Sequence, residues 1–123
     1  MSVKRIMVVE DDLLLNTATC DCLQTYGYQA DPFYCAATAI EALKRGEYIA
    51  ALVTDIDLGV GADGFQVAAQ ARQLYPRLPV VFASGTRGAQ HTSYGVRGSA
   101  FVPKPFRPHQ IIHALQAMRL EAA

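Results

Sequence analysis

Short apolar runs alternate along the chain with longer stretches that have helical spacing. Each run is mostly apolar and shows no clean alternation of polar and apolar residues, which is typical of strands buried on both faces. The five predicted strands are Arg5–Val9, Tyr28–Phe33, Ala50–Thr54, Pro79–Ala83 and Ala100–Pro103. Strands that alternate with helices predict an α/β fold, an open parallel sheet with helices on both faces.

Four of the intervals have apolar residues at helical spacing. They are Asp12–Tyr26, Ala36–Arg45, Gly64–Tyr75 and Pro108–Leu120. In the first, the apolar stripe Leu15, Ala18, Cys22 and Tyr26 is expected to face the core. The interval from Gly85 to Ser99 is rich in glycine, so we expect at most a short or irregular fourth helix there.

Composition limits the domain organisation and the kind of partner. A chain of 123 residues with 51% hydrophobic residues has room for one packed domain, predicted to span residues 1–123. The 11 basic and 11 acidic residues balance, which argues against a nucleic-acid or anionic-membrane partner. No apolar run approaches the length of a membrane span, and no secretory signal is visible. Three cysteines without a CxxC pair favour a reducing, cytoplasmic setting.

Charged and hydroxyl side chains follow four of the five predicted strands. The segments are Glu10-Asp11-Asp12, Asp55-Ile56-Asp57, Ser84-Gly85 and Lys104-Pro105-Phe106. The carboxyl ends of parallel strands share one sheet edge, where ligands bind, so these groups should converge. Carboxylates packed together need a compensating charge, which a lysine and a hard cation such as Mg²⁺ supply. This chemistry suits phosphoryl transfer, in which a carboxylate can be the nucleophile.

The order of these motifs resembles that of the receiver domains of bacterial two-component response regulators. The resemblance covers residues 4 to about 120 and implies a doubly wound, flavodoxin-like sheet of five strands in the order 2-1-3-4-5. It also implies phosphorelay signalling, with no turnover activity, and a sensor histidine kinase or histidine phosphotransfer protein as partner. The motifs are Val8-Val9-Glu10-Asp11, Val53-Thr54-Asp55, Asp63-Gly64, Pro79–Gly85 and Phe101–Phe106.

The resemblance assigns a role to each matching acid. Asp55 matches the phosphorylated aspartate. Glu10 and Asp11 match the acidic pair that holds Mg²⁺ or Mn²⁺, together with Asp55 and the backbone carbonyl of Asp57. The Asp57 side chain has two open interpretations, a solvated loop acid or a group that tunes hydrolysis of the aspartyl phosphate.

Three more residues match family positions after the fourth and fifth strands. Ser84 matches the switch hydroxyl and Phe101 the switch aromatic, which move inward together. Lys104 matches the lysine that pairs with the phosphoryl group and, with Ser84, supports catalysis; the Lys104–Pro105 bond matches the family's cis peptide. A surface that includes residues 85–99 is expected to change on phosphorylation. Since the motifs use nearly the whole chain, no output domain is expected within it.

Two other functions stay open on the residues alone. The chain could be a docking module that works without phosphorylation. Less favourably, Asp55-Ile56-Asp57 fits the DxDx pattern of haloacid-dehalogenase-type phosphatases, although that motif normally follows the first strand. Asp12 and Asp63-Gly64 also have plain structural interpretations as helix caps or turns, and the cysteines as small apolar fillers.

Overall fold

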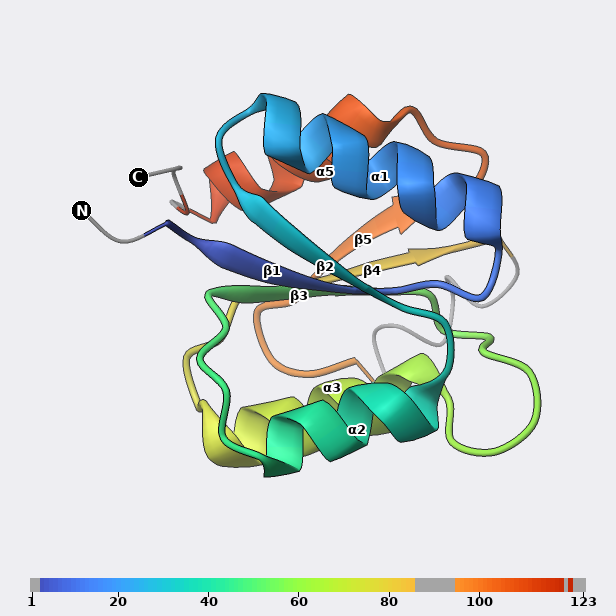
Figure 1. Cartoon of the computed structure of the whole chain (residues 1–123), viewed down its shortest axis with the longest axis vertical. Helices are drawn as coiled ribbons and strands as arrows, with labels where there is room; N and C mark the ends of the chain where they lie inside the picture. The colour runs from blue at the N-terminus through green and yellow to red at the C-terminus, as the bar shows by residue number, and fades with distance from the viewer. Residues whose placement is uncertain (1–2, 86–94, 119, 121–123) are drawn as a thin grey trace.

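The computed structural model describes residues 3–85, 95–118 and 120. Five strands form one parallel sheet in the order β2-β1-β3-β4-β5, which confirms the expected fold class (Figure 1). The strands are β1 (Arg5–Val9), β2 (Gln29–Phe33), β3 (Ala51–Thr54), β4 (Val80–Ser84) and β5 (Ala100–Pro103). Each lies within one residue of its prediction at both ends.

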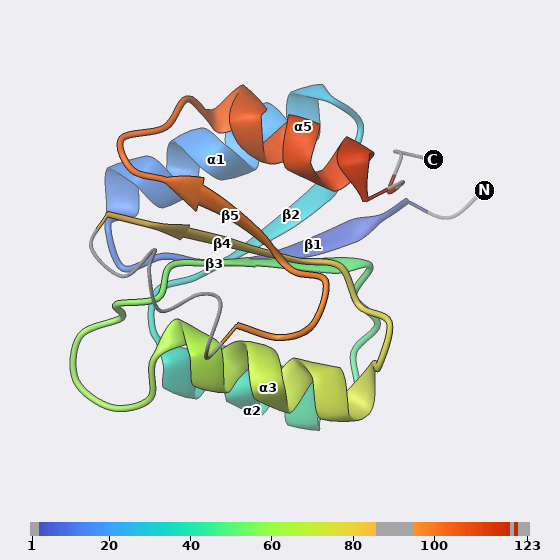
Figure 2. The same cartoon turned by 180° about the vertical axis from the view of Figure 1, so that it is seen from behind.

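Helices cover both faces of the sheet. They are α1 (Leu13–Thr25), α2 (Ala36–Lys44), α3 (Gly64–Leu74) and α5 (Pro108–Ala117). α1 and α5 lie on one face, and α2 and α3 on the other (Figures 1 and 2). The expected short or irregular fourth helix falls mainly on residues 86–94, which lie outside the described residues. No helix in the described part of the chain is long and apolar enough to cross a membrane.

The inner strands divide their apolar side chains between two cores. In β1, Met7 and Val9 join the core beneath α2 and α3, whereas Ile6 and Val8 join the core beneath α1 and α5. Successive side chains of a strand point to opposite faces, so a strand covered on both faces has to be apolar throughout. This explains why the central strands show no polar alternation in the sequence.

The edge strand β2 departs from the prediction of burial on both faces. Gln29 and Pro32 are exposed there. β2 pairs with β1 alone, and an edge position tolerates a proline that cannot donate a ladder hydrogen bond. The general prediction of fully buried strands is therefore wrong for this strand.

The predicted apolar stripe of α1 is wrong in part. Leu15 and Cys22 are half-buried, and Cys22 packs against the core beneath α1 and α5. The fully buried residues of α1 are instead Asn16, Thr19, Cys20 and Leu23. Of the predicted stripe, Tyr26 is 50% exposed and Ala18 is exposed as well. The prediction failed because two polar residues, Asn16 and Thr19, take core-facing positions.

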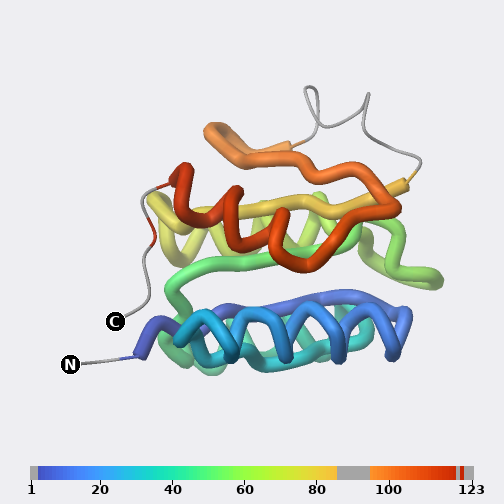
Figure 3. Tube along the Cα trace, turned by 90° about the horizontal axis from the view of Figure 1, so that it is seen from above, coloured from blue at the N-terminus to red at the C-terminus, as the bar shows by residue number. Residues whose placement is uncertain are grey.

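Both ends of the described chain lie at the end of the sheet where the strands begin, that is, at their amino ends. β1 starts there with Arg5, and α5 runs back toward the same edge beside α1 (Figure 3). The Tyr28 hydroxyl, one residue before β2, donates a 2.7 Å hydrogen bond to the Leu120 carbonyl. The carboxyl ends of the strands, with their acids, form the opposite edge.

Candidate functional site

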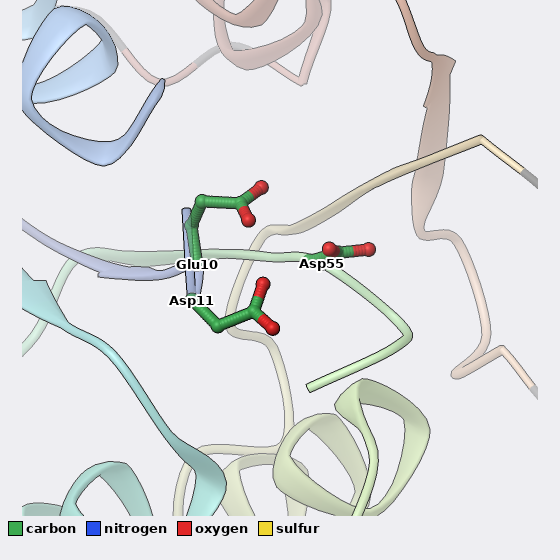
Figure 4. A group of neighbouring side chains, drawn as sticks. All are labelled: Glu10, Asp11 and Asp55. Carbon is green, nitrogen blue, oxygen red and sulfur yellow. The ribbon is translucent and has the colours of Figure 1, made fainter. Parts of the chain in front are cut away.

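Three carboxylates meet at the carboxyl edge of the central strands. Glu10 and Asp11 directly follow β1, and Asp55 directly follows β3. One carboxylate oxygen from each lies within 4.8 Å of the other two, and the Glu10 and Asp11 side chains turn toward the side on which Asp55 lies (Figure 4). Glu10 and Asp55 are buried, whereas Asp11 is exposed. A set of hard oxygen donors open to solvent on one side fits Mg²⁺, which keeps several of its water ligands.

Hydrogen bonds to its backbone hold Asp55 beside the end of β1, where Glu10 and Asp11 follow. The Asp55 N–H donates to the Val9 carbonyl at 2.9 Å, which continues the β1–β3 pairing to the acid itself. The Thr54 hydroxyl donates to the Asp55 carbonyl at 2.8 Å. The acid cluster therefore lies at the ends of two inner strands of the sheet, β1 and β3.

Lys104 joins the two buried acids. Its Nζ lies 2.8 Å from Glu10 Oε1 and 2.9 Å from Asp55 Oδ2. Lys104 follows β5, and its bond to Pro105 is cis, as the resemblance implied. The ammonium offsets part of the charge that the carboxylates concentrate at this edge.

Burial and the contacts between Lys104 and the carboxylates act in opposite directions on the pKa values of Glu10 and Lys104. Burial is the main reason that the pKa of Glu10 is raised, and the nearby Asp55 charge adds to the shift, although hydrogen bonds from Lys104 and the Asp12 N–H oppose it. For Lys104, burial acts to lower the pKa, but hydrogen bonds and charge from Glu10 and Asp55 outweigh it, so that the pKa is raised. Lys104 is thus held as a cation between the acids.

Ser84 and Phe101 lie on the neighbouring strands. Ser84 ends β4 and is 1% exposed, and among the described residues its Oγ has no hydrogen-bond partner. A buried hydroxyl without a partner is unusual and needs an explanation. Phe101 of β5 is half-buried and packs against the core beneath α2 and α3.

The remaining predicted acids have distinct places. Asp57 is exposed, and its N–H donates to Asp55 Oδ1 at 3.3 Å. Asp12 caps α1 by accepting the Leu15 N–H, and Asp63 caps α3 in a capping box with Gln66. The structural interpretations of Asp12 and Asp63 are therefore confirmed.

One residue close to Asp55 was interpreted only as helix-start chemistry. A Cβ at Gly64 would lie 2.8 Å from the Asp55 carbonyl carbon and 2.9 Å from the Ile56 Cα, and closer still to the Asp55 carbonyl oxygen. Glycine is required because the first residue of α3 packs directly against the backbone of the acid site. An unfavourable helix former at a helix start is the sequence signal for such a close approach.

The chain belongs to the response regulator receiver domain family, whose pattern matches residues 6–116. It is 34% identical over 121 residues to the sensor protein TorS of Escherichia coli (strain K12). The matched region covers 95% of this chain and 13% of TorS. It is 28% identical over 122 residues to the response regulator receiver protein CpdR of Brucella abortus (strain 2308), covering 98% of this chain and 100% of CpdR.

A solved structure has the same architecture. The response regulator receiver protein from Sinorhizobium medicae WSM419 superposes with a TM-score of 0.92 at 33% identity, covering 95% of this chain and 94% of that one. Receiver domains are signalling switches of two-component phosphorelays and not turnover enzymes, and their partners include a histidine kinase. Family membership therefore argues against the DxDx phosphatase reading of Asp55 and Asp57.

Proposed function

We propose that Asp55 accepts a phosphoryl group from a phosphohistidine of a sensor histidine kinase or histidine phosphotransfer protein. The observation that carries this proposal is the position of Asp55, whose carboxylate lies beside two further acids and in direct contact with Lys104. A phosphoryl acceptor needs a nucleophile with nearby positive charge, and this site offers both.

The transfer is a substitution at phosphorus. An Asp55 carboxylate oxygen attacks the phosphorus atom, a new O–P bond forms, and the P–N bond of the phosphohistidine breaks. The electron pair of that bond stays on the imidazole nitrogen, and the departing ring is neutral when its other nitrogen carries a proton. The products are an acyl phosphate on Asp55 and a free histidine on the partner.

Glu10, Asp11 and Asp55 are the side chains that would hold a divalent cation, Mg²⁺ or Mn²⁺, with the Asp57 backbone carbonyl as a further ligand. Bound there, the cation would neutralise charge on the phosphoryl oxygens. The contact of Lys104 with an Asp55 oxygen supports a role in which its ammonium pairs with a phosphoryl group on that residue.

We expect the Ser84 hydroxyl, like the Lys104 ammonium, to bind the phosphoryl group on Asp55. Its buried Oγ lacks a partner among the described residues, so a hydrogen bond to a phosphoryl oxygen would satisfy it. We expect Phe101 to move inward with Ser84 and to change a surface for a protein partner, which shifts a two-state equilibrium. Residues 86–94 of the expected surface lie outside the described residues.

The proposal also includes the extent and the location of the domain. We propose that residues 1–123 form a single receiver domain and that it works in the cytoplasm.

Incubation with acetyl phosphate and Mg²⁺, followed by intact mass measurement, tests the proposal. The wild-type chain should gain the mass of one phosphoryl group, and Asp55→Asn should gain none. Asp57→Asn is the matched control, because it alters a nearby carboxylate and keeps the backbone carbonyl; it should still be labelled. If the wild-type chain gains no mass with any phosphoryl donor, the chain is a docking module and the proposal is wrong.

A further inference from the structure

Asn16 is a wholly buried polar residue behind the acid cluster. It lies on the core-facing side of α1 and is 0% exposed. Burying an amide is unfavourable unless its donors and acceptor are hydrogen-bonded. The contacts of Asn16 therefore show how the cost of burying its amide is offset.

The side-chain amide joins three elements. Its Nδ2 donates to the Glu10 carbonyl at 3.1 Å and to the Phe33 carbonyl at 3.0 Å, and it lies 3.5 Å from the Val8 carbonyl. Its Oδ1 accepts a 3.3 Å hydrogen bond from the Cys20 thiol, one turn along α1. Carbonyl oxygens on one side and a thiol on the other fix the orientation of the amide. Asn16 thus ties the start of α1 to the ends of β1 and β2.

Four contacts hold the backbone and the side chain of Glu10. Its backbone N–H donates to the same Phe33 carbonyl at 2.9 Å, and its carbonyl accepts from Asn16. Its carboxylate accepts from the Asp12 N–H at 3.0 Å and contacts Lys104. Glu10 and Asp11 lie in the short connection between β1 and α1, so the direction of this backbone decides where both carboxylates point.

We propose that Asn16 is a positioning residue for the cation site. By holding the Glu10 carbonyl against the end of β2, it fixes the connection that carries Glu10 and Asp11 and aims both carboxylates at Asp55. This inference rests on the proposed function only in taking these acids as the cation ligands. Groups that orient metal ligands through hydrogen bonds commonly change metal affinity by roughly 10–100-fold when they are removed.

Calorimetric titration with Mg²⁺ tests the role of Asn16. Asn16→Ala should weaken Mg²⁺ binding by about tenfold or more. In the acetyl phosphate reaction, the Mg²⁺ concentration at half-maximal rate should rise by the same factor. Thr19→Ala is the matched control: Thr19 is 2% exposed, lies one turn further along α1, and makes no hydrogen bond to residues 10–12 among the described contacts. It should keep wild-type Mg²⁺ affinity even where it lowers stability.

Equal Mg²⁺ affinity in Asn16→Ala and in the wild type would overturn the inference, as would an equal loss in Thr19→Ala. If Asn16→Ala does not fold, Asn16→Ser replaces it, since the shorter hydroxyl cannot bridge both carbonyl oxygens; wild-type affinity in this variant contradicts the inference. The Asn16 side-chain amide should also shift in NMR spectra as Mg²⁺ is added to the wild type. A chain that binds Mg²⁺ but is not phosphorylated contradicts the proposed function and leaves the affinity test of Asn16 intact.

Discussion

The backbone N–H of Lys104 donates a 3.0 Å hydrogen bond to the carbonyl oxygen of Ser84. This contact continues the β4–β5 pairing beyond the last ladder pair, Ser84 and Pro103. It sets the two residues side by side at the carboxyl edge, with the Lys104 ammonium on Asp55 and the Ser84 hydroxyl buried. Lys104, which contacts Asp55, and Ser84, which we expect to respond to phosphorylation of Asp55, are therefore joined by a backbone hydrogen bond.

Lys104→Ala should permit Mg²⁺ binding but uncouple phosphorylation from the switch. Removing the ammonium leaves Glu10 and Asp55 without their shared counter-charge, so a divalent cation is still attracted to them. NMR spectra before and after acetyl phosphate treatment report the response of Ser84 and Phe101. Wild-type shifts of both residues in the phosphorylated variant would contradict the role of Lys104. Lys44→Ala, at the exposed end of α2, is the control and should respond normally.

Ser84→Ala should leave the fold as stable or make it more stable, by up to about 1–3 kcal/mol, because it removes a buried hydroxyl that lacks a partner. Thr54→Val is the contrasting variant. It removes a buried hydroxyl that donates to the Asp55 carbonyl, and should cost about 1 kcal/mol. Urea unfolding in the absence of a phosphoryl donor measures both. A clear loss of stability in Ser84→Ala would show that its hydroxyl is satisfied in the resting state.

Asp57→Asn should change the lifetime of the aspartyl phosphate. Asp57 is exposed two residues past Asp55, and its N–H contacts an Asp55 oxygen. We expect its charge to lie where a water molecule would approach the phosphoryl group. The decay of the phosphorylated mass after removal of acetyl phosphate gives the lifetime. An unchanged lifetime would assign Asp57 to the alternative interpretation, a solvated loop acid.

Gly64→Ala should destabilise the fold by about 1–3 kcal/mol and slow phosphorylation, because the new methyl group would press on the Asp55 carbonyl. Gly85→Ala is the control for stability. Among the described residues, a Cβ there would meet only the Lys104 Cβ, at an ordinary 3.7 Å. Urea unfolding and acetyl phosphate labelling measure the two effects. Equal stability of the two variants would show that α3 can move away from Asp55 without cost.

Cys35 should react with iodoacetamide faster than Cys20 in the native protein. The pKa of Cys35 is lowered, chiefly by the hydrogen bond of its thiol with Thr38. Burial raises the pKa of Cys20 to about 11. As the pH rises from 7 to 9, the reactive thiolate therefore forms first at Cys35. Peptide mass mapping measures the order, and Thr38→Val should slow the reaction at Cys35. Equal rates at Cys20 and Cys35 would contradict the pKa order.

The sequence was sufficient for the sheet and for the gathering of the acids, because both follow from local patterns. Apolar runs predicted the strands, and acids placed directly after strands had to meet at one edge. It was insufficient for α1, where Asn16 and Thr19 face the core. Asn16 is compatible with burial only because carbonyl oxygens of β1 and β2 approach it in the folded chain. Such a partner is distant in sequence and leaves no periodic signal.

The close packing of α3 on Asp55 could not be predicted from the sequence, because it too depends on a contact between distant parts of the chain. Gly64 follows a helix-capping aspartate, and a glycine in that place is easily taken as turn chemistry. Only the folded chain shows that the backbone of the acid site occupies the space that a side chain would need.

The hydrogen bond between Tyr28 and Leu120 has a practical consequence for experiments with this domain. Because it holds Leu120 at the end of the sheet where β1 begins, the first and last described residues lie away from the carboxylates. An affinity tag, a fluorophore or a sensor-chip tether attached at either end would leave the acid edge free for a phosphodonor protein. Immobilised and free protein should then accept phosphoryl groups at comparable rates.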